Sequence, residues 1–418
     1  MKKIFSCADI LLPKAQNMEL WSVVACDQFS SQPEYWDSLD ALVGDAPSTL
    51  RLMLPEAYLE SRDQFAEAEK INALMEKYLS EDVFEVLPQS YIYVERTLAD
   101  GRLRRGLMGV LDLDEYDYSA DSVSPIRATE GTVVDRLPPR VRVRRGAALE
   151  MPHIMVFIDD ESDSVLGLLR EKRESLEKLY DFPLNAGGGH IRGYAVKAEN
   201  AWALEKAVDA LGDESTLRAR YGDAAPAIFA MGDGNHSLAT AKKCWEEIKP
   251  IISEEERETH PARYSLVELV NIHDEAIEFE PIHKVVFETE PSRFIADCEK
   301  WWKEHSCEGN SHSIRLVVGG EERELSVSGL TIGELIGLAE EFCRSYMASH
   351  GGRIDYIHND DTAIAMGRRE GCAALLLPPM KKGELFPSII KSGPFPKKSF
   401  SIGHAEDQRY YLECRKIK

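Results

Sequence analysis

The chain has 418 residues, and its hydrophobic fraction of 44% with a charged fraction of 29% is the composition of a globular protein. At this length the chain is expected to form roughly two or three domains. Acidic residues outnumber basic ones by 72 to 50, so the formal net charge is −22. Because this average field repels phosphate, the composition argues against a general binder of nucleic acids or anionic membranes.

Neither the apolar segments nor the cysteines point to a membrane or secreted protein. No apolar run approaches the roughly 18 residues that a membrane-spanning helix needs. The eight cysteines are scattered along the chain, and no two of them form a Cys-x-x-Cys pair. This cysteine usage is typical of a reduced compartment. We therefore predict a cytoplasmic protein.

The first part of the chain predicts a strand, a helix and a β-hairpin. Residues 21–25 form an apolar run that predicts a strand ending just before Asp27. Residues 56–78 have the apolar spacing of an amphipathic helix. An Asp-Gly turn separates residues 90–97 from residues 102–113, and this pattern predicts a hairpin.

Beyond the hairpin comes a dense basic stretch in this otherwise acidic chain. Such a local inversion of charge would attract a phosphate group. The alternative is a strand whose arginines at positions 140, 142 and 144 share one solvated face, since alternate residues of a strand point the same way. The stretch contains Arg127, Arg136, Arg140, Arg142, Arg144 and Arg145.

The middle of the chain is predicted to alternate strands with helices. Residues 226–231 are apolar and predict a short buried strand. Residues 237–249, which follow a glycine-rich turn, repeat apolar side chains along one stripe of a helix. The other predicted elements are strands at 151–158 and 264–272 and helices at 164–180 and 201–211.

The last part of the chain predicts a second domain. A Gly-Gly turn separates residues 314–318 from residues 324–327, which predicts another hairpin. A helix is predicted over 332–347. We place the two domains at residues 1–290 and 291–418.

The strongest functional signal is the segment Gly232-Asp233-Gly234-Asn235-His236-Ser237. A strand, a Gly-x-Gly turn and a helix follow one another here, and a helix start offers unpaired N–H groups to an anion. His236 and Ser237 add side-chain donors, while Asp233 can hold a metal ion or accept a hydroxyl proton. The alternative is ordinary turn chemistry, in which Asn235 or Ser237 caps the helix.

Two familiar nucleotide motifs do not describe this segment. A P-loop is excluded because the sequence contains no Gly-x4-Gly-Lys-Ser/Thr. Ser237 occupies the last glycine position of Gly-x-Gly-x-x-Gly, which disfavours a dinucleotide site. Asp27 follows an apolar run directly and is the candidate base for a substrate hydroxyl, with a turn or helix-cap aspartate as the alternative.

The segment around this turn resembles a large prokaryotic family, the domain of unknown function 1015. Asp-Gly-Asn-His-Ser-Leu-Ala-Thr-Ala, which begins at Asp233, is similar to the Asp-Gly-His-His-Arg-Tyr-x-x-Ala fingerprint of that family. Other segments agree in order, so the resemblance spans nearly the whole chain. They are Val23–Asp27, Gly106–Tyr118, Glu130–Thr132 with Arg136, Pro281–Lys284 and Pro396–Ser399.

The resemblance implies an α/β (α+β) protein with a mixed core of the ParB/sulfiredoxin-like type, carrying insertions, and a C-terminal α/β domain. That superfamily includes free-serine kinases, nucleotide-dependent partition switches and an ATP-using reductase. The resemblance also implies that Glu130, Thr132 and Arg136 line the phosphate pocket, with His283 and Lys398 as further cofactor contacts. Gly232, Gly234, Asn235 and Ser237 would bind the cofactor from the turn itself.

This chain departs from the family fingerprint at two positions. Asn235 stands where the first histidine is expected, and Ser237 stands where an arginine is expected. A serine cannot replace the bidentate phosphate clamp of an arginine. Either another arginine supplies the clamp or phosphate binding is weakened.

The favoured hypothesis is a nucleotide-dependent enzyme that phosphorylates a small hydroxylated metabolite, such as a kinase of a free, serine-like amino acid. Asp27, Asp233 and His236 would be catalytic, the nucleotide would be ADP or ATP, and Asp233 would hold Mg²⁺. The alternative is a non-catalytic nucleotide-binding switch or interaction protein of the ParB-like superfamily. That branch needs a basic helix-turn-helix, and none is visible after residue 250. Neither a membrane nor a nucleic acid is an expected partner, and a homo-oligomer is compatible with the sequence.

Overall fold

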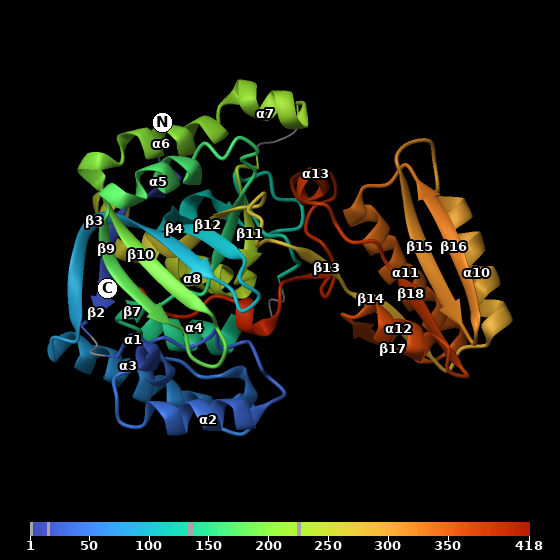
Figure 1. The fold of residues 1–418 in the computed structure, drawn as a ribbon, viewed down its shortest axis with the longest axis horizontal. Helices are drawn as coiled ribbons and strands as arrows, with labels where there is room; N and C mark the ends of the chain where they lie inside the picture. The colour runs from blue at the N-terminus through green and yellow to red at the C-terminus, as the bar shows by residue number, and fades with distance from the viewer. Residues whose placement is uncertain (1–2, 15–16, 133–136, 224–226) are drawn as a thin grey trace. The chain divides into compact units, whose positions relative to one another are not determined.

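The computed structural model describes residues 3–14, 17–132, 137–223 and 227–418 (Figure 1). The chain divides into two compact units. Unit 1 comprises Met1–Ala128, Thr132–Ile277 and His404–Lys418, and unit 2 comprises Thr129–Gly131 and Glu278–Gly403.

The division differs from the one expected at residues 290 and 291. The strand β14 (His283–Phe287) pairs with two other strands of unit 2, so the residues that precede the expected boundary already belong to that unit. The final segment, His404–Lys418, returns to unit 1 instead of ending unit 2.

In the described part of unit 1, eleven strands form one mixed sheet. The strands are β1 (Phe5–Ser6), β2 (Ala8–Pro13), β3 (Phe84–Thr97), β4 (Leu103–Asp112), β5 (Tyr116–Asp117), β6 (Ile126–Arg127), β8 (Met155–Ile158), β9 (Glu177–Pro183), β10 (His190–Lys197), β11 (Phe229–Asp233) and β12 (Tyr264–Asn271). The main path runs β5-β6-β11-β8-β12-β4-β3-β10-β9, with β1 on β4 and β2 on β3. The pairs β5 with β6, β6 with β11 and β8 with β12 are parallel.

Both faces of this sheet are buried, because alternate side chains of its central strands enter two different cores. Ile92 and Val94 of β3 pack with the core on one face, and Tyr91 and Tyr93 pack with the core on the other. Figure 1 shows α5 and α6 over one face and α1, α2 and α3 beyond the other. The helices are α1 (Met18–Trp21), α2 (Pro33–Val43), α3 (Gln64–Ser80), α4 (Leu137–Gly146), α5 (Leu166–Lys172), α6 (Trp202–Leu211), α7 (Glu214–Tyr221), α8 (Asn235–Ile248) and α9 (Glu254–Thr259).

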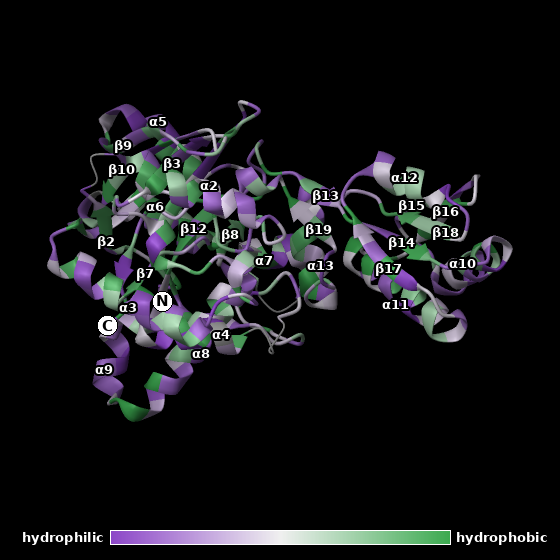
Figure 2. Ribbon diagram, turned by 90° about the horizontal axis from the view of Figure 1, so that it is seen from below, coloured by the Kyte–Doolittle hydropathy of each residue, from purple (hydrophilic) through white to green (hydrophobic). Residues whose placement is uncertain are grey.

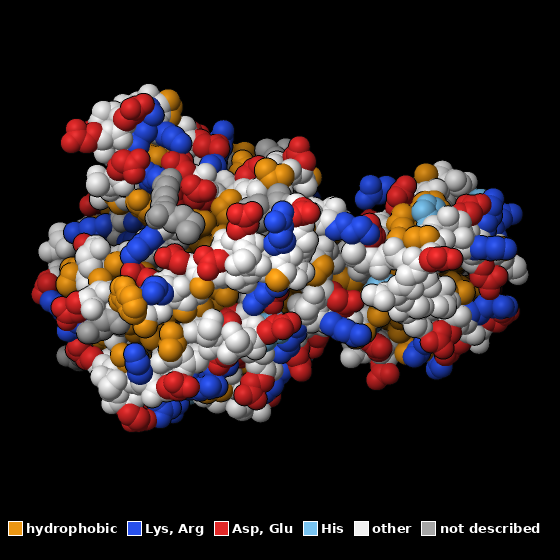
Figure 3. All heavy atoms as spheres, turned by 90° about the horizontal axis from the view of Figure 1, so that it is seen from above, with side chains coloured by type: hydrophobic (Ala, Val, Ile, Leu, Met, Phe, Trp, Pro, Cys, Tyr) orange, Lys and Arg blue, Asp and Glu red, His pale blue; other side chains and the backbone are white. Residues whose placement is uncertain are grey.

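The hydropathy of the elements follows this layering. The wholly apolar strand β8 is green in Figure 2, whereas α9, whose sequence is Glu-Glu-Glu-Arg-Glu-Thr, is mostly purple. On the face seen in Figure 3, acidic and basic side chains are interspersed and neither sign gathers in one large patch. Among the described helices, none is long and apolar enough to cross a membrane.

The returning C-terminal segment is part of the unit 1 core. The Trp21 ring N–H donates to the Leu412 carbonyl at 3.0 Å, and Leu11 pairs with Cys414 through backbone hydrogen bonds. The buried Arg96 guanidinium donates to the backbone carbonyls of residues 406–408 in the same segment. A short two-stranded pairing of β7 (Leu149–Glu150) with β20 (Arg415–Lys416) completes the attachment.

Unit 2 is a five-stranded antiparallel sheet with helices. Its strand order is β16-β15-β18-β14-β17, and a separate two-stranded sheet pairs β13 with β19. The predicted hairpin around the Gly-Gly turn and the predicted helix after it are both confirmed, as β15, β16 and α11. The elements besides β14 are β13 (Phe279–Pro281), β15 (Ser311–Val318), β16 (Glu321–Ser328), β17 (Arg353–Ile357), β18 (Cys372–Leu376), β19 (Phe400–Ile402), α10 (Pro291–His305), α11 (Ile332–His350), α12 (Asp360–Gly367) and α13 (Leu385–Ser392).

Four predicted elements of unit 1 are wrong in type or extent. The helix predicted over 56–78 begins only at Gln64, where the Asp63 side chain caps α3. Residues 21–25 are not a strand, since α1 ends at Trp21 and only Val24 forms an isolated bridge, with Tyr410. The helix predicted over 164–180 ends early because β9 begins at Glu177 and pairs with β10.

The fourth wrong element is the strand given as the alternative to a phosphate site for the basic stretch, because residues 137–146 form a helix. Leu137 and Val141 of α4 form a small buried cluster with Ala239 and Cys244 of α8, and this packing overrides the strand-like alternation of valines and arginines. The predicted helix over 237–249 and the hairpin of β3 and β4 are confirmed.

Candidate functional site

The glycine-rich segment forms the predicted tight turn between a buried strand and a helix. Strand β11 ends at Asp233, and α8 begins at Asn235. Between them Gly234 has a φ of 80°, and a Cβ atom there would lie 3.0 Å from Ile154. The left-handed backbone and this close approach both favour glycine. Gly234 is also the N-cap residue, and as a glycine it has no side chain to cap the start of α8.

Asp233 is held at this turn with one carboxylate oxygen unsatisfied. Its Oδ1 accepts the Gly234 N–H at 2.7 Å, and its Oδ2 is buried without a hydrogen-bond partner among the described residues. Burial, and next the negative charge of Asp27, raise the pKa of Asp233 to about 6, with His153 opposing the shift. Two carboxylates therefore lie near enough to interact, and one of them is costly to ionise.

His153 joins the carboxylates to the start of α8. Its Nε2 lies 3.7 Å from Asp27 Oδ2 and 3.4 Å from Ser237 Oγ. Its Nδ1 lies 2.8 Å from the Tyr411 hydroxyl, which accepts the Cys26 N–H at 3.3 Å. A Tyr411 hydroxyl that accepts from Cys26 can donate its own proton to Nδ1. The neutral ring then carries its proton on Nε2, directed toward Asp27 and Ser237.

Electrostatics keep Tyr411 and Cys26 in their neutral forms. Burial raises the pKa of Tyr411 well above its ordinary value, with the nearby Cys26 and Asp27 acting in the same direction. Burial and then Asp27 raise the pKa of the Cys26 thiol to about 11. Tyr411 is therefore a hydrogen-bond donor at neutral pH, and Cys26 is not a reactive thiolate.

His153 and Tyr411 were not identified from the sequence. His153 stands between a proline and an apolar strand with no motif around it, and Tyr411 lies in the C-terminal segment, 258 positions further along the chain. A single histidine or tyrosine carries no spacing signal. Only the return of the C-terminal segment to unit 1 brings the two rings together.

The other predicted residues of unit 1 have mixed surroundings. Thr132 Oγ1 is buried and has no hydrogen-bond partner among the described residues. Asn235 is buried at the first position of α8, and the half-buried His236 follows it, with its carbonyl accepting the Thr240 hydroxyl. Arg136 lies outside the described residues.

The remaining predicted residues belong to unit 2. Glu130 and Lys398 meet there, since the Lys398 N–H donates to Glu130 Oε1 at 3.0 Å. His283 is buried, its Nδ1 accepts the Leu377 N–H at 3.2 Å, and its Nε2 lies 2.8 Å from Asp360 Oδ1. Burial lowers the pKa of His283, although Asp360 opposes that shift. Both ring nitrogens of His283 are thus engaged within the unit.

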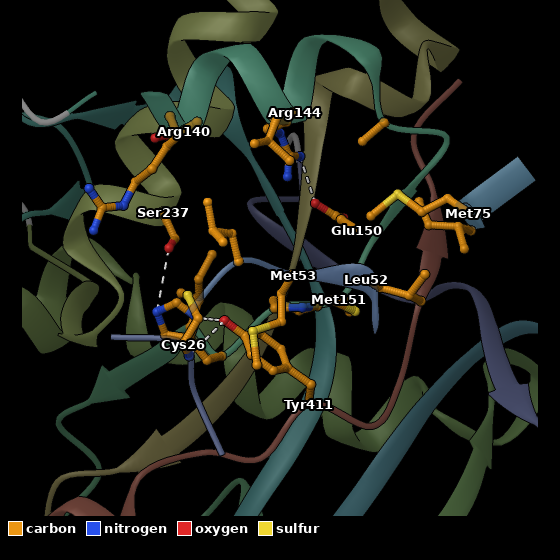
Figure 4. Close-up of a pocket in the computed structure, with 18 of the residues that line it drawn as sticks. Cys26, Leu52, Met53, Met75, Arg140, Arg144, Glu150, Met151, Ser237 and Tyr411 are labelled. Atoms are coloured by element: carbon orange, nitrogen blue, oxygen red, sulfur yellow. Dashed lines mark hydrogen bonds and ion pairs between the residues drawn. The ribbon is translucent and has the colours of Figure 1, made fainter. Parts of the chain in front are cut away.

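A cavity of about 200 Å³ in unit 1 opens beside Ser237 and His153 (Figure 4). Arg140 lines the same cavity as Ser237, which occupies the arginine position of the family fingerprint. Arg140 pairs with Glu56, which balances its charge.

Within the described residues, no group of three or more His, Cys, Asp or Glu side chains is arranged to hold a metal ion. The pair of Asp233 and Asp27 nevertheless offers carboxylate oxygens, one of them buried without a partner. Mg²⁺ commonly uses one or two protein carboxylates together with phosphate oxygens and water. The residues present therefore fit a Mg²⁺ ion that arrives with a phosphate.

The chain matches the model of a family described as Protein of unknown function (DUF1015) over residues 6–340. No curated protein matches the chain. SbnI with C-terminal truncation from Staphylococcus aureus is similar at 10% identity and a TM-score of 0.34, covering 71% of this chain and 82% of that one. A free serine kinase in complex with AMP is similar at 10% identity and a TM-score of 0.34, and the match covers 74% of this chain and 90% of that one. A conserved hypothetical protein from Pyrococcus furiosus is similar at 10% identity and a TM-score of 0.31, and the match covers 74% of this chain and 94% of that one.

Proposed function

The chain belongs to this DUF1015 family, and we propose that it is a nucleotide-dependent phosphotransferase that acts on the hydroxyl group of a small metabolite. The observation that carries the proposal is the position of Asp233. Its buried Oδ2 has no hydrogen-bond partner among the described residues, and its pKa is raised beside a second carboxylate, at the start of a helix whose N-cap residue is a glycine. Perturbed carboxylates in such places are typical of functional sites.

The start of α8 supports the binding of the nucleotide phosphates. A helix of this length presents the positive end of its dipole and its first N–H groups at Asn235, His236 and Ser237. Gly232 and Gly234 let the backbone approach a phosphate closely. Glu130, Thr132, Arg136, His283 and Lys398 remain proposed cofactor contacts on the strength of the family resemblance.

Phosphate transfer needs a group that accepts the hydroxyl proton and a second group that stabilises this acceptor. The substrate oxygen forms a bond to the terminal phosphorus of ADP or ATP, and the bond from that phosphorus to the bridging oxygen breaks, with its electron pair leaving on the nucleotide. Asp27 accepts the hydroxyl proton, and His153 Nε2, 3.7 Å from Asp27 Oδ2, stabilises the carboxylate before transfer. His236, in the first turn of α8, is proposed to donate to the transferred phosphate.

Asp233 would hold the Mg²⁺ ion, and Asp27 lies near it. The ion supplies positive charge that offsets the negative charge of the phosphate oxygens. The protein contributes a fixed carboxylate, since Gly234 holds Asp233 Oδ1 and leaves Oδ2 for the cation. A serine-like free amino acid is the acceptor that the family resemblance implies.

The proposal is tested by a thermal-shift screen with ADP, ATP, GTP and CTP, with and without Mg²⁺, followed by an assay of phosphate transfer. A nucleotide at about one hundred times its dissociation constant should stabilise the fold by about 2.7 kcal/mol. Gly234→Ala should abolish that stabilisation, because alanine is strained at a φ of 80° and would contact Ile154.

Gly222→Ala is the matched control, since Gly222 also has a positive φ of 70° but has open space around it. It should lower stability by about 1 kcal/mol and leave nucleotide binding unchanged. If no nucleotide stabilises the protein, the proposal is wrong. If a nucleotide binds but no hydroxyl compound is phosphorylated, the non-catalytic switch replaces it.

A further inference from the structure

The cavity beside Ser237 and His153 has an apolar far wall. Three methionines from separate segments line it, namely Met53, Met75 of α3 and Met151, together with the buried Leu52 and Leu149. Figure 4 shows Met75 at one end, Ser237 toward the other, and Met53 and Met151 between them. Methionine side chains are flexible and polarisable, so such a wall adapts to apolar ligands of different shapes.

The charged side chains that line the cavity all take part in ion pairs. Arg144 and Arg415 both pair with Glu150, at 2.6 and 2.7 Å, and Arg140 pairs with Glu56. A ligand that brought its own carboxylate or ammonium group would have to break one of these pairs. Burying a charge without a partner is costly, so the cavity favours an uncharged carbon skeleton.

Hydrogen-bonding capacity for a ligand is concentrated at one end. The Gln64 amide donates to the Leu59 carbonyl, and the Thr240 hydroxyl donates to the His236 carbonyl. Ser237 Oγ and His153 Nε2 are joined only by a long contact of 3.4 Å. A ligand hydroxyl that bridges these two atoms from the cavity side would form a shorter hydrogen bond with each of them.

The size of the cavity sets a limit on the ligand. One water needs about 10–15 Å³ of such space, so a cavity of about 200 Å³ holds roughly ten or more non-hydrogen atoms. A small alcohol fits within this limit.

We infer that this cavity receives the carbon skeleton of the phosphate acceptor, and that the acceptor is an uncharged alcohol with an apolar chain of about four to eight carbons, not a free amino acid. The hydroxyl would bridge Ser237 and His153 from the cavity side, and the chain would lie against Met53, Met75 and Met151. The role as acceptor rests on the proposed phosphotransferase function, whereas the class of ligand rests on the cavity alone.

The inference is tested by NMR of protein labelled with ¹³C at the methionine methyl groups, without nucleotide. n-Hexanol should shift the resonances of Met53, Met75 and Met151, assigned by single substitutions to leucine, and leave Met366 of unit 2 unchanged. The dissociation constant should fall about fourfold for each methylene added between n-butanol and n-hexanol. L-Serine and glycerol at equal concentrations should leave the three resonances in place.

A pair of variants checks the location of the ligand. Met53→Gln, which keeps the size of the side chain but makes it polar, should weaken n-hexanol binding about fourfold or more. Met347→Gln is the control, because Met347 is half-buried on α11 of unit 2 and does not line the cavity. Equal effects of the two substitutions would overturn the assignment of this cavity.

The outcomes separate this inference from the proposed function. If L-serine moves the three methionine resonances as far as n-hexanol does, or n-hexanol moves none of them, the acceptor class is wrong even where phosphate transfer is observed. If n-hexanol binds as expected but no nucleotide binds in the thermal-shift screen, the phosphotransferase function is overturned and the class of ligand stands.

Discussion

Two partly buried carboxylates, Glu340 of unit 2 and Asp233 of unit 1, are compensated differently. In unit 2 the buried Lys284 lies 2.7 Å from Glu340, and Tyr356 donates to the same carboxylate at 2.9 Å. Although burial acts to raise the pKa of Glu340, these partners hold it below its ordinary value. In unit 1 burial and Asp27 raise the pKa of Asp233, and its Oδ2 has no described partner.

This difference separates charges that hold a fold from charges that are available for chemistry. A compensated buried pair costs stability when one partner is removed, but it has no capacity left for a ligand. An uncompensated carboxylate already costs stability in the folded protein and retains the capacity to bind a cation or a proton. The pair in unit 2 is therefore expected to affect folding, and the pair in unit 1 is expected to affect turnover.

The largest expected effect is on turnover in unit 1. Asp233→Asn should lower phosphate transfer by about 10²-fold or more, because the cation ligand and the negative charge are both lost. Steady-state kinetics of the purified variant measure this effect. Asp297→Asn is the matched control in unit 2, where Asp297 lies 3.4 Å from His350, and it should leave turnover unchanged. Equal losses from the two substitutions would break the comparison between the units.

The next largest effect is on the stability of unit 2. Lys284→Met should destabilise the sheet of unit 2 by about 3 kcal/mol, because the Glu340 carboxylate loses its buried cation. Hydrogen exchange of the β14 and β18 amides measures this free energy of opening. Lys391→Met removes the exposed pair with Glu334 and should cost less than about 1 kcal/mol. A stable Lys284→Met variant that no longer binds nucleotide would instead assign this pair to function.

The third effect is a pH-dependent gain in stability from Asp233→Asn, measured by urea unfolding in EDTA. The pKa of Asp233 is about 6 in the folded protein against 3.8 ordinarily, so the folded state is progressively penalised as pH rises from about 4 to 6. Above this window the asparagine variant should be more stable by about 1–2 kcal/mol. This gain is smaller than the free energy that corresponds to a shift of two full pKa units, because Asp233 is only half-buried. Below about pH 4 the gain should disappear.

The control for this pH effect has the opposite sign. Hydrogen bonds from His190 and then Lys178 lower the pKa of Asp181 to about 2. Its carboxylate therefore stabilises the fold above the ordinary pKa of 3.8, and that contribution is lost as pH falls toward 2. Asp181→Asn should be less stable than the wild type at neutral pH. A loss of stability at neutral pH in Asp233→Asn as well would show that Asp233 acts as a structural residue.

The smallest expected effect comes from the hydroxyl that orients His153. Tyr411→Phe should cost about 1 kcal/mol of stability and lower turnover about tenfold, since Nδ1 of His153 loses its donor. The ¹⁵N chemical shifts of His153 should show a smaller population of the tautomer with its proton on Nε2. Tyr356→Phe in unit 2 removes a hydroxyl that donates to Glu340, so it should cost similar stability and leave turnover unchanged. An unchanged His153 spectrum in Tyr411→Phe would contradict the orienting role.

The elements that the sequence predicted well are those whose signals are local. The hairpin of β3 and β4 is specified by an Asp-Gly turn between two strand-like runs, and α8 by one apolar stripe after a glycine turn. The basic helix α4 was wrongly interpreted as a strand, because Val141 and its neighbours alternate like a strand until α8 packs against them. The strand predicted over residues 21–25 was wrong for a similar reason, since Tyr410 of the returning segment determines their pairing.

The candidate site shows the same division between local and distant information. The turn at Asp233 could be predicted, because glycines and a following helix form a contiguous pattern. The contact of Ser237 with His153 joins positions 84 residues apart, and that of His153 with Tyr411 joins positions 258 apart. No periodicity or spacing rule connects such pairs. They follow from the path of the chain through two units.

That path also orders events during synthesis. The segment that carries Tyr411 is translated after all of unit 2, although it belongs to the core of unit 1. While the ribosome is still making unit 2, His153 lacks its hydrogen-bond partner, and the nascent unit 1 lacks the backbone that pairs with Leu11 and Val24. Domains that lie earlier in a chain usually fold first during translation. Here the N-terminal unit cannot finish folding first, so the candidate site is assembled only after the ribosome has passed the last helix of unit 2.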